Sequence, residues 1–265
     1  VTTFFIPAFI AEYYDYPGDI WCVTTDADIS RAWAPLDPHS SRIKYLASNG
    51  RVVERLKLYG VRAENIYATG FPIPKELVGG VSSKILKDLL TDRLCNLDPN
   101  GIFHDRYARV LKSELGPTRC KQKTAVHPLT LTYSVGGAGA QRALGVKIIK
   151  SLKSKIRRHE IRVNLMAGYR KDAIDYYRNA VKDLGLKKEL GEWVVIPDHE
   201  SRADYFSDFN EVLKTTDILW TKPSELSFYC GLGVAVVMAP PIGSQEEFNR
   251  VWLQYVGGGV SQNDP

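Results

Sequence analysis

The sequence contains no apolar run of the ~20 residues that a membrane-spanning helix requires. Its opening stretch, VTTFFIPAFIAEYYDYPGD, is apolar, but it lacks the basic start and the small-residue cleavage site of a signal peptide. We therefore expect this stretch to form a core strand with its connection, and we expect a cytoplasmic protein.

Cysteine is scarce: Cys22, Cys95, Cys120 and Cys230 are widely spaced among 265 residues, and no CxxC pair occurs. This pattern excludes a disulfide framework and a zinc site of the usual spacing, and it predicts reduced, buried thiols. The five histidines show no ligand spacing either. We therefore expect no metal and no resident cofactor.

Charge is nearly balanced, with 35 basic against 30 acidic residues and a net charge of +5. Part of the basic excess lies in residues 151–162 and 119–123. Such segments are either solvated helix faces or a surface that favours anionic membrane lipid or a phosphorylated substrate. No nucleic-acid partner is indicated.

Strand-like and helix-like segments alternate along most of the chain, which predicts an α/β fold with parallel sheets. Residues 1–75 and 128–265 show this alternation, whereas residues 76–127 contain two helical patterns without a strand. We therefore expect a partial N-terminal domain (1–75), a helical connection (76–127) and a C-terminal domain (128–265). The expected strands of the C-terminal domain are residues 128–134, 160–167, 192–197, 217–220 and 233–239.

Both ends of the chain are unusual. It begins at Val1 within an apolar run and stops at GGGVSQNDP without a closing element. We expect a fragment whose N-terminal domain is incomplete, and hence little or no catalytic turnover from this chain alone.

Small residues follow the first strand of the C-terminal domain in the segment SVGGAGAQ. Gly136, Gly137 and Gly139 open a predicted helix, at the strand end where open α/β sheets bind ligands. A helix N-terminus offers unpaired N–H groups and a positive dipole end, which suits a phosphate. The spacing is neither that of a dinucleotide fold nor that of a P-loop, so a tight strand-to-helix turn explains it equally well.

A second group of polar residues lies in DILWTKPSELSFYCGLGVAVVMAPPIGSQEEFN, residues 217–249. We expect its side chains to gather at the same sheet edge as the glycines, where they would suit a diphosphate and a ribose: Lys222, Ser224, Glu225, Gln245, Glu246 and Asn249. The plainer interpretation is a pair of well-capped helices, with Ser244 and Glu247 forming a capping box.

Together, TKPSELSFYCGLGVAVVMAPPIGSQEEFN and the upstream VGGAGAQ resemble the donor-binding half of GT-B glycosyltransferases. The resemblance is to the group of the lipid-linked N-acetylglucosaminyl transferase of peptidoglycan synthesis and monogalactosyldiacylglycerol synthase. It implies two Rossmann-like, doubly wound domains and transfer of a sugar from a nucleotide-sugar, expected to be a UDP-sugar. The acceptor it implies includes a lipid at the membrane surface, which would make the protein peripheral to the membrane.

The resemblance also assigns roles to residues. It places the three glycines at the diphosphate, Gln245, Glu246 and Asn249 near the ribose and sugar, and Glu225 at the ribose. The glycine loop is one residue shorter than in the peptidoglycan enzyme, Glu225 is displaced by one position, and Glu246 replaces a glutamine.

Asp26 and Asp28 form a D-x-D after a predicted strand. In the GT-B interpretation either is a candidate carboxylate for accepting the acceptor's proton. In GT-A glycosyltransferases a D-x-D instead holds a divalent metal and the donor diphosphate. A third interpretation is structural, with Asp28 or Ser30 capping a helix. A sugar-nucleotide epimerase and a non-catalytic nucleotide-sugar-binding module remain alternatives.

Overall fold

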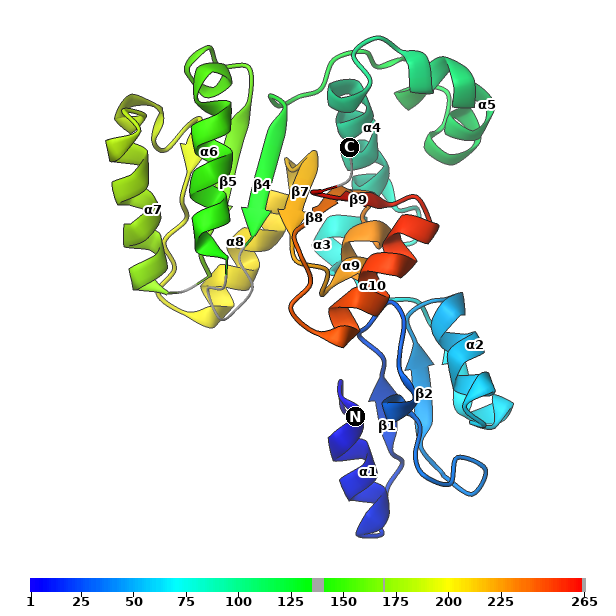
Figure 1. Ribbon diagram of the computed structural model, residues 1–265. Coiled ribbons are helices and arrows are strands. Elements are labelled where there is room, and N and C mark those ends of the chain that lie inside the picture. The colour runs from blue at the N-terminus through cyan, green and yellow to red at the C-terminus, as the bar shows by residue number, and fades with distance from the viewer. Residues whose placement is uncertain (135–140, 169, 264–265) are drawn as a thin grey trace. The chain divides into compact units, whose positions relative to one another are not determined.

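The structure, a computed structural model, describes residues 1–134, 141–168 and 170–263 (Figure 1). The chain divides into two compact units. The first unit comprises Val1–Ile73, Pro223–Gly231 and Met238–Pro265, and the second comprises Pro74–Lys222 and Leu232–Val237. These divisions do not coincide with the expected boundaries, because the helical connection falls within the second unit and two segments near the C-terminus pack with residues 1–73.

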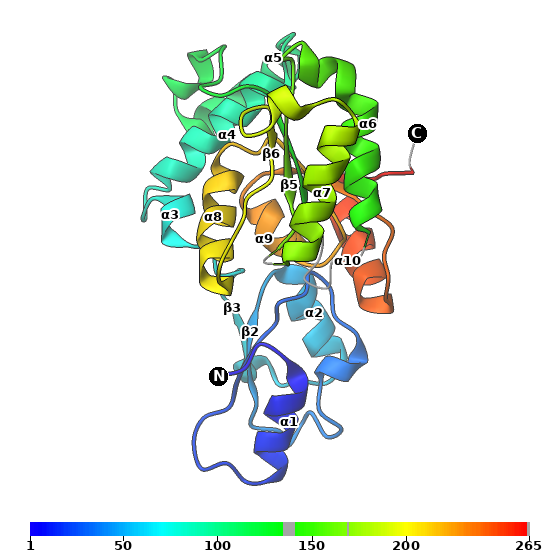
Figure 2. The ribbon, with the colours of Figure 1, turned by 90° about the vertical axis from the view of Figure 1, so that its left-hand side faces the viewer.

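The first unit is built on a three-stranded parallel sheet in the order β1-β2-β3, with β1 at Trp21–Val23, β2 at Lys44–Ala47 and β3 at Ile66–Ala68. Helices α1 (Phe5–Tyr13) and α2 (Gly50–Leu58) lie on the same side of this sheet (Figure 2). Inward-facing residues of the strands pack with Val52 and Leu56 of α2. This unit also contains α9 (Leu226–Gly231) and α10 (Ser244–Tyr255).

The expected strand at the start of the chain is wrong, because residues 5–13 form α1. Thr2 pairs with the sheet through an isolated bridge to Cys22. Phe5 and Phe9 pack against the core of the first unit, whereas Ile10 is 53% exposed. A run that is apolar on every side has no period, so its sequence cannot separate a helix from a buried strand.

The larger sheet has six strands in the order β6-β5-β4-β7-β8-β9. They are β4 (Thr130–Ser134), β5 (Arg162–Met166), β6 (Val194–Val195), β7 (Ile218–Thr221), β8 (Ala235–Met238) and β9 (Gly259–Ser261). Strand β4 pairs in parallel with β5 and β7, and β5 pairs in parallel with β6. The two parallel sheets flanked by helices confirm the predicted α/β class, and five expected strands are present. Strand β9 was not expected, because its segment consists mainly of turn-forming residues.

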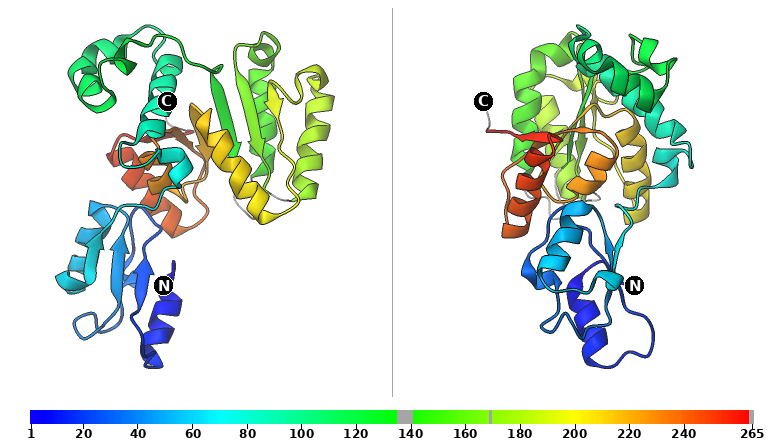
Figure 3. Two further views of the ribbon diagram at one scale, coloured as in Figure 1. Left: turned by 180° about the vertical axis from the view of Figure 1, so that it is seen from behind. Right: turned by 90° about the vertical axis from the view of Figure 1, so that its right-hand side faces the viewer.

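Helices cover both faces of the sheet in the second unit. Helices α6 and α7 lie on one face, and α4 and α8 lie on the other (Figures 2 and 3). The helices of this unit are α3 (Lys75–Val78), α4 (Lys84–Leu97), α5 (Ile102–Leu115), α6 (Arg142–Arg157), α7 (Lys171–Asp183) and α8 (Arg202–Lys214). Among the described residues, no helix is long and apolar enough to cross a bilayer.

Helix α6 approaches the sheet closely at Gly145. A Cβ atom there would lie 2.8 Å from the Tyr177 hydroxyl and 2.9 Å from Cδ1 of Tyr133. Glycine therefore lets α6 bury Ile148, Ile149 and other core side chains against the sheet.

A buried arginine ties α4 to the sheet of the second unit. The Arg93 guanidinium donates hydrogen bonds to the backbone carbonyls of Thr216 (2.8 Å), Leu232 (2.6 Å) and Leu213 (2.8 Å). Arg93 is only 2% exposed, and this burial lowers its pKa to about 10. The three bonds satisfy carbonyl groups that would otherwise be buried without a partner.

Candidate functional site

The polar side chains of greatest interest gather in the first unit around Asn249, which is fully buried at the first turns of α10. Its Oδ1 accepts hydrogen bonds from the backbone N–H groups of Ala27 (2.9 Å) and Asp28 (3.3 Å). Its Nδ2 donates to the carbonyls of Pro223 (3.2 Å) and Ser224 (3.1 Å). One carboxamide thus joins two loops that are about 200 residues apart in sequence.

Asp26 follows the carboxyl end of β1 and accepts a further hydrogen bond from Nδ2 of Asn249 (3.3 Å). The pKa of Asp26 is raised to about 6, mainly by burial and also by the nearby Glu225 carboxylate, while the hydrogen bond from Asn249 lowers it. Desolvation disfavours the charged form of a carboxyl, and a like charge adds to that effect. Asp26 therefore has the proton affinity expected of a general base working near neutral pH.

Asp28, two residues on, has a different environment. Its carboxylate meets Arg55 Nε at 2.9 Å and Arg51 Nε at 3.2 Å, and it accepts a bond from the N–H of Ile29 (2.9 Å). The residue is 4% exposed. Asp28 anchors helix α2 through two arginines, whereas no cationic side chain in the described part of the chain forms an ion pair with Asp26.

The two carboxylates of the D-x-D have different partners, and this difference is relevant to the GT-A interpretation, in which both would hold a metal ion. One carboxylate is bonded to two arginines and the other to an asparagine amide. Among the residues that the structure describes, no group of three or more His, Cys, Asp or Glu side chains is arranged to hold a metal ion. Asp28 therefore anchors its loop to helix α2, and Asp26 contributes a carboxyl group beside that anchor.

The other predicted residues of the first unit have distinct partners. Gln245 donates from Nε2 to the carbonyl of Asp28 (2.5 Å), and Oε2 of Glu246 accepts from the N–H of Ile242 (2.9 Å). The Ser224 hydroxyl donates to the carboxylate of Glu225. The structure therefore brings Gln245, Asn249 and Asp26 to one loop, with Glu225 close enough to affect the charge of Asp26.

The predicted capping box at the start of α10 is wrong. Gly243 occupies the N-cap position, and Ser244 is already the first helical residue. Glu247 pairs with Arg250 one turn later, at 2.5 Å. A capping box does occur at Ser201 and Asp204, at the start of α8.

The remaining predicted residues are those assigned to the diphosphate. Gly136, Gly137 and Gly139 are outside the described residues. Lys222 is the last residue of its segment in the second unit, directly before Pro223. Their role at a diphosphate stays a prediction.

Sequence reasoning missed Asn49, which makes a further hydrogen bond to the loop that contains Asp26 and Asp28. Its Oδ1 caps α2 by accepting from the N–H groups of Arg51 and Val52, and its Nδ2 donates to the carbonyl of Ala27 (2.8 Å) and to the Ser227 hydroxyl (3.3 Å). An asparagine directly before a helical pattern is a recognised N-cap signal. Its second contact, with α9, has no signal in the sequence.

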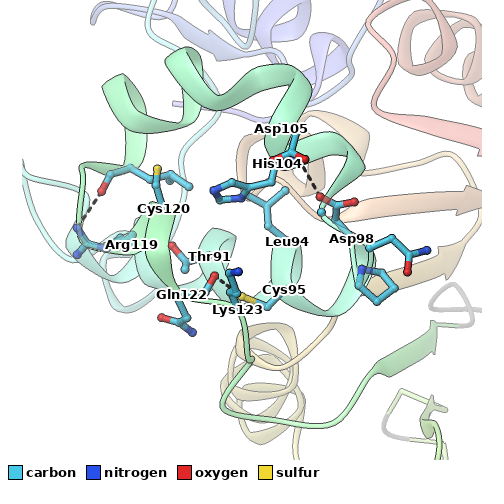
Figure 4. A pocket seen from close by; sticks show the side chains of 14 residues that line it. Thr91, Leu94, Cys95, Asp98, His104, Asp105, Arg119, Cys120, Gln122 and Lys123 are labelled. Carbon is cyan, nitrogen blue, oxygen red and sulfur yellow. Dashed lines mark hydrogen bonds between the residues drawn. The ribbon is translucent and has the colours of Figure 1, made fainter.

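A separate cavity of about 290 Å³ lies in the second unit between α4, α5 and the 3-10 turn Arg119–Lys121 (Figure 4). Its polar residues include Asp98, which accepts from the backbone N–H of His104 (2.8 Å), and Arg119, which pairs with Asp88 (2.6 Å). Cys95 and Cys120 also line it, and all four cysteines of the chain are free thiols. None of the predicted site residues lies in this cavity.

Comparisons with known proteins give distant matches. No family model and no curated protein matches the chain. Among solved structures, Anabaena HepE in complex with UDP-glucose matches with a TM-score of 0.38 and 9% identity over 94% of this chain and 65% of that chain. The UDP complex gives 0.38 and 10% over 95% and 65%, and the complex with UDP and glucose gives 0.33 and 11% over 77% and 46%.

This chain thus spans between 46% and 65% of the length of HepE. These similarities are too low to carry the activity of HepE over to this chain. The narrower resemblance to the peptidoglycan and galactolipid enzymes finds no support in the comparisons.

Proposed function

We propose that this protein is a glycosyltransferase that moves a sugar from a nucleotide-sugar, with a UDP-sugar as the expected donor, to an acceptor hydroxyl. The observation that carries the proposal is the Asp26 carboxyl, whose pKa is raised to about 6 by burial at the end of a parallel strand. Asn249 donates a hydrogen bond to this carboxyl and Gln245 donates one to the carbonyl of Asp28, and both belong to the segment that resembles the donor-binding half of GT-B enzymes.

The chemistry assigned to Asp26 is general base catalysis. The acceptor oxygen attacks the anomeric carbon, the bond from that carbon to the diphosphate oxygen breaks, and the diphosphate leaves with the electron pair. The acceptor proton passes to the Asp26 carboxylate. A base with a pKa near 6 is mostly ionised at neutral pH and still accepts a proton readily, which is the balance that such catalysis needs.

The resemblance to GT-B enzymes supplies the proposed donor contacts. Glu225 is the proposed partner of the ribose hydroxyls, while Lys222 and the glycine segment before α6 are the proposed partners of the diphosphate. Helix α6 carries no acidic residue in its first turn, so its N-terminus is suited to a departing anion. A lipid-linked acceptor remains part of the proposal, since the resemblance implies one.

Binding and turnover test this proposal separately. Calorimetry with UDP should show binding by the parent chain that persists in EDTA and weakens in Glu225→Ala. Transfer, hydrolysis and epimerisation of a panel of UDP-sugars should be followed in parallel. Absence of any UDP or UDP-sugar binding would overturn the assignment, and binding that EDTA abolishes would favour the GT-A alternative.

Asp26→Asn isolates the catalytic role. It should lower turnover by a factor of about 10² or more, the range of general base catalysis, and leave UDP affinity nearly unchanged. Asp15→Asn is the matched control, because Asp15 is an exposed carboxylate of the same unit. Equal turnover by Asp26→Asn and the parent would exclude Asp26 as the base. Because little or no turnover is expected from this chain alone, turnover is compared in a full-length protein that contains it, and donor binding without turnover there would support the non-catalytic binding module.

A further inference from the structure

The basic residues of this chain are concentrated in one stretch. Residues 115–159 contain ten of the 35 lysines and arginines and none of the 30 aspartates and glutamates. The rest of the chain therefore has more acidic than basic residues. A cationic region on a chain that is otherwise mildly acidic indicates an anionic partner.

Helix α6 and the residue after it carry seven of these ten cations, four of them on the outer face of the helix. Its inner face buries Ile148, Ile149 and Ile156. At 100° per residue, the side opposite these isoleucines presents Lys147, Lys150, Ser151, Ser154, Arg157 and Arg158, all of which are exposed. Lys147 and Arg158 are about 16 Å apart along the axis at 1.5 Å per residue. We call these six residues the α6 cationic face.

Part of this face is hollowed. A shallow depression of about 490 Å³ is lined by the two serines and by four cations, Lys150, Lys153, Arg157 and Arg158. Lys147, Lys150 and Lys153 form no ion pair within the described part of the chain, whereas Arg158 pairs with Glu160 at 2.6 Å. Hydroxyl and ammonium donors around one hollow suit the phosphate of a headgroup.

A second, smaller hollow adjoins the first at Lys150 and runs between α6 and α7. It is lined by Val146, Tyr176, Ala180, Leu184 and other side chains, including the carboxylate-bearing Asp183. Most of these side chains are apolar and partly exposed. Helices α6 and α7 lie side by side on their face of the sheet (Figure 2), so apolar surface lies directly beside the row of cations.

We propose that the α6 cationic face docks on the surface of a membrane that contains anionic phospholipid. A straight helix presents its cations in one plane, which matches a plane of headgroup phosphates. Recognition of single-stranded nucleic acid would require exposed aromatic rings for stacking. Helix α6 has no aromatic residue, and the Arg142 guanidinium lies over the neighbouring Tyr176 ring at 4.9 Å. This docking surface is independent of the proposed transferase activity.

Vesicle sedimentation tests the docking surface. The parent chain should bind vesicles that contain one third phosphatidylglycerol in phosphatidylcholine, should not bind phosphatidylcholine alone, and should be released by high salt. Each basic side chain near an anionic bilayer contributes about fivefold in affinity. The variant Lys147→Gln/Lys150→Gln/Lys153→Gln removes two cations of this face and Lys153 of the adjoining hollow, and it should therefore bind about 100-fold more weakly.

The matched control removes the same charge elsewhere in the second unit. Lys75→Gln/Lys84→Gln/Lys112→Gln alters α3, α4 and α5 and should bind vesicles as the parent does, with both variants checked for folding by circular dichroism and melting. Equal loss in both variants would mean that net charge and not this face causes binding, and would overturn the proposal. So would the absence of vesicle binding by the parent, or binding of polyuridylate in preference to vesicles.

Discussion

Replacing Asn249 with alanine should lower the free energy of unfolding of the first unit by about 3 to 5 kcal/mol. The substitution leaves the N–H groups of Ala27 and Asp28 and the carbonyls of Pro223 and Ser224 without their partner. Each buried polar group without a partner costs about 1 to 3 kcal/mol. We expect a total below the full sum, because water can enter beside Asp26, which is only partly buried.

Asn249→Asp is the isosteric companion variant. It keeps the acceptor for Ala27 and Asp28, but it turns a carboxylate oxygen toward the carbonyl of Ser224 and toward Asp26. The pKa of the new carboxyl should therefore be raised above its ordinary value. Its protonated form can donate a hydrogen bond, so the stability that is lost at pH 8 should be partly regained as pH falls through the raised pKa.

Urea unfolding gives the free energies, and amide hydrogen exchange gives the location. The N–H groups of Ala27 and Asp28 should lose protection in Asn249→Ala before residues of the second unit do. Asn210→Ala is the control, because Asn210 donates a single bond to Glu76 on the surface, and it should change stability by no more than about 0.5 kcal/mol. The reasoning is refuted if Asn249→Ala costs less than about 1 kcal/mol or leaves the Ala27 amide as protected as in the parent.

Three further predictions concern Asp26, Arg93 and Gly233. Asp26→Asn should raise the free energy of unfolding by up to about 3 kcal/mol at pH 7.5 and by almost nothing near pH 4. The reason is that the pKa of Asp26 is about 6 in the folded chain and ordinarily 3.8, so its charged form destabilises the fold only as pH rises. An equal gain at both pH values in urea titrations would contradict this prediction. Arg93→Met should destabilise the second unit by about 3 kcal/mol or more, because three carbonyls lose their donor, while Arg109→Met on the surface should be nearly neutral in thermal melts. Gly233→Ala should cost about 1 to 3 kcal/mol, because φ is +63° and the new Cβ would lie 2.2 Å from Cδ2 of Leu90; an unchanged melting temperature would show that Leu90 moves aside freely.

Most helices and strands could be predicted from the sequence, because their apolar residues recur with a regular spacing or their ends are marked by turn-forming residues. Strand β5 is a buried apolar run, and α7 buries Ala173, Ile174, Tyr177 and Val181 at helical spacing. Helix α1 and strand β9 could not be read in this way. The first is apolar on every side, and the second has only three residues among glycines.

The sequence singles out individual polar residues as candidates, but it does not encode the contacts that they make in the folded chain. Asn249, Gln245 and Asp26 stood out as polar residues after strands or at helix starts. That the Asn249 carboxamide would bond to the loop of Asp26 depends on contacts across 223 positions, which no local pattern encodes. The different environments of Asp26 and Asp28 likewise arise from Arg51 and Arg55, which approach Asp28 only in the folded chain.

The division of the first unit among three chain segments has a consequence for how this protein is made. Residues 1–73 leave the ribosome first, but α9 and α10, which complete their unit, follow only after residue 222. At 5 to 20 residues per second, about 8 to 30 s separate the two events. The second unit is complete once residue 237 has emerged. The three-stranded sheet is therefore synthesised well before Asn249, and during that interval water must satisfy the N–H groups of Ala27 and Asp28 that Asn249 later binds.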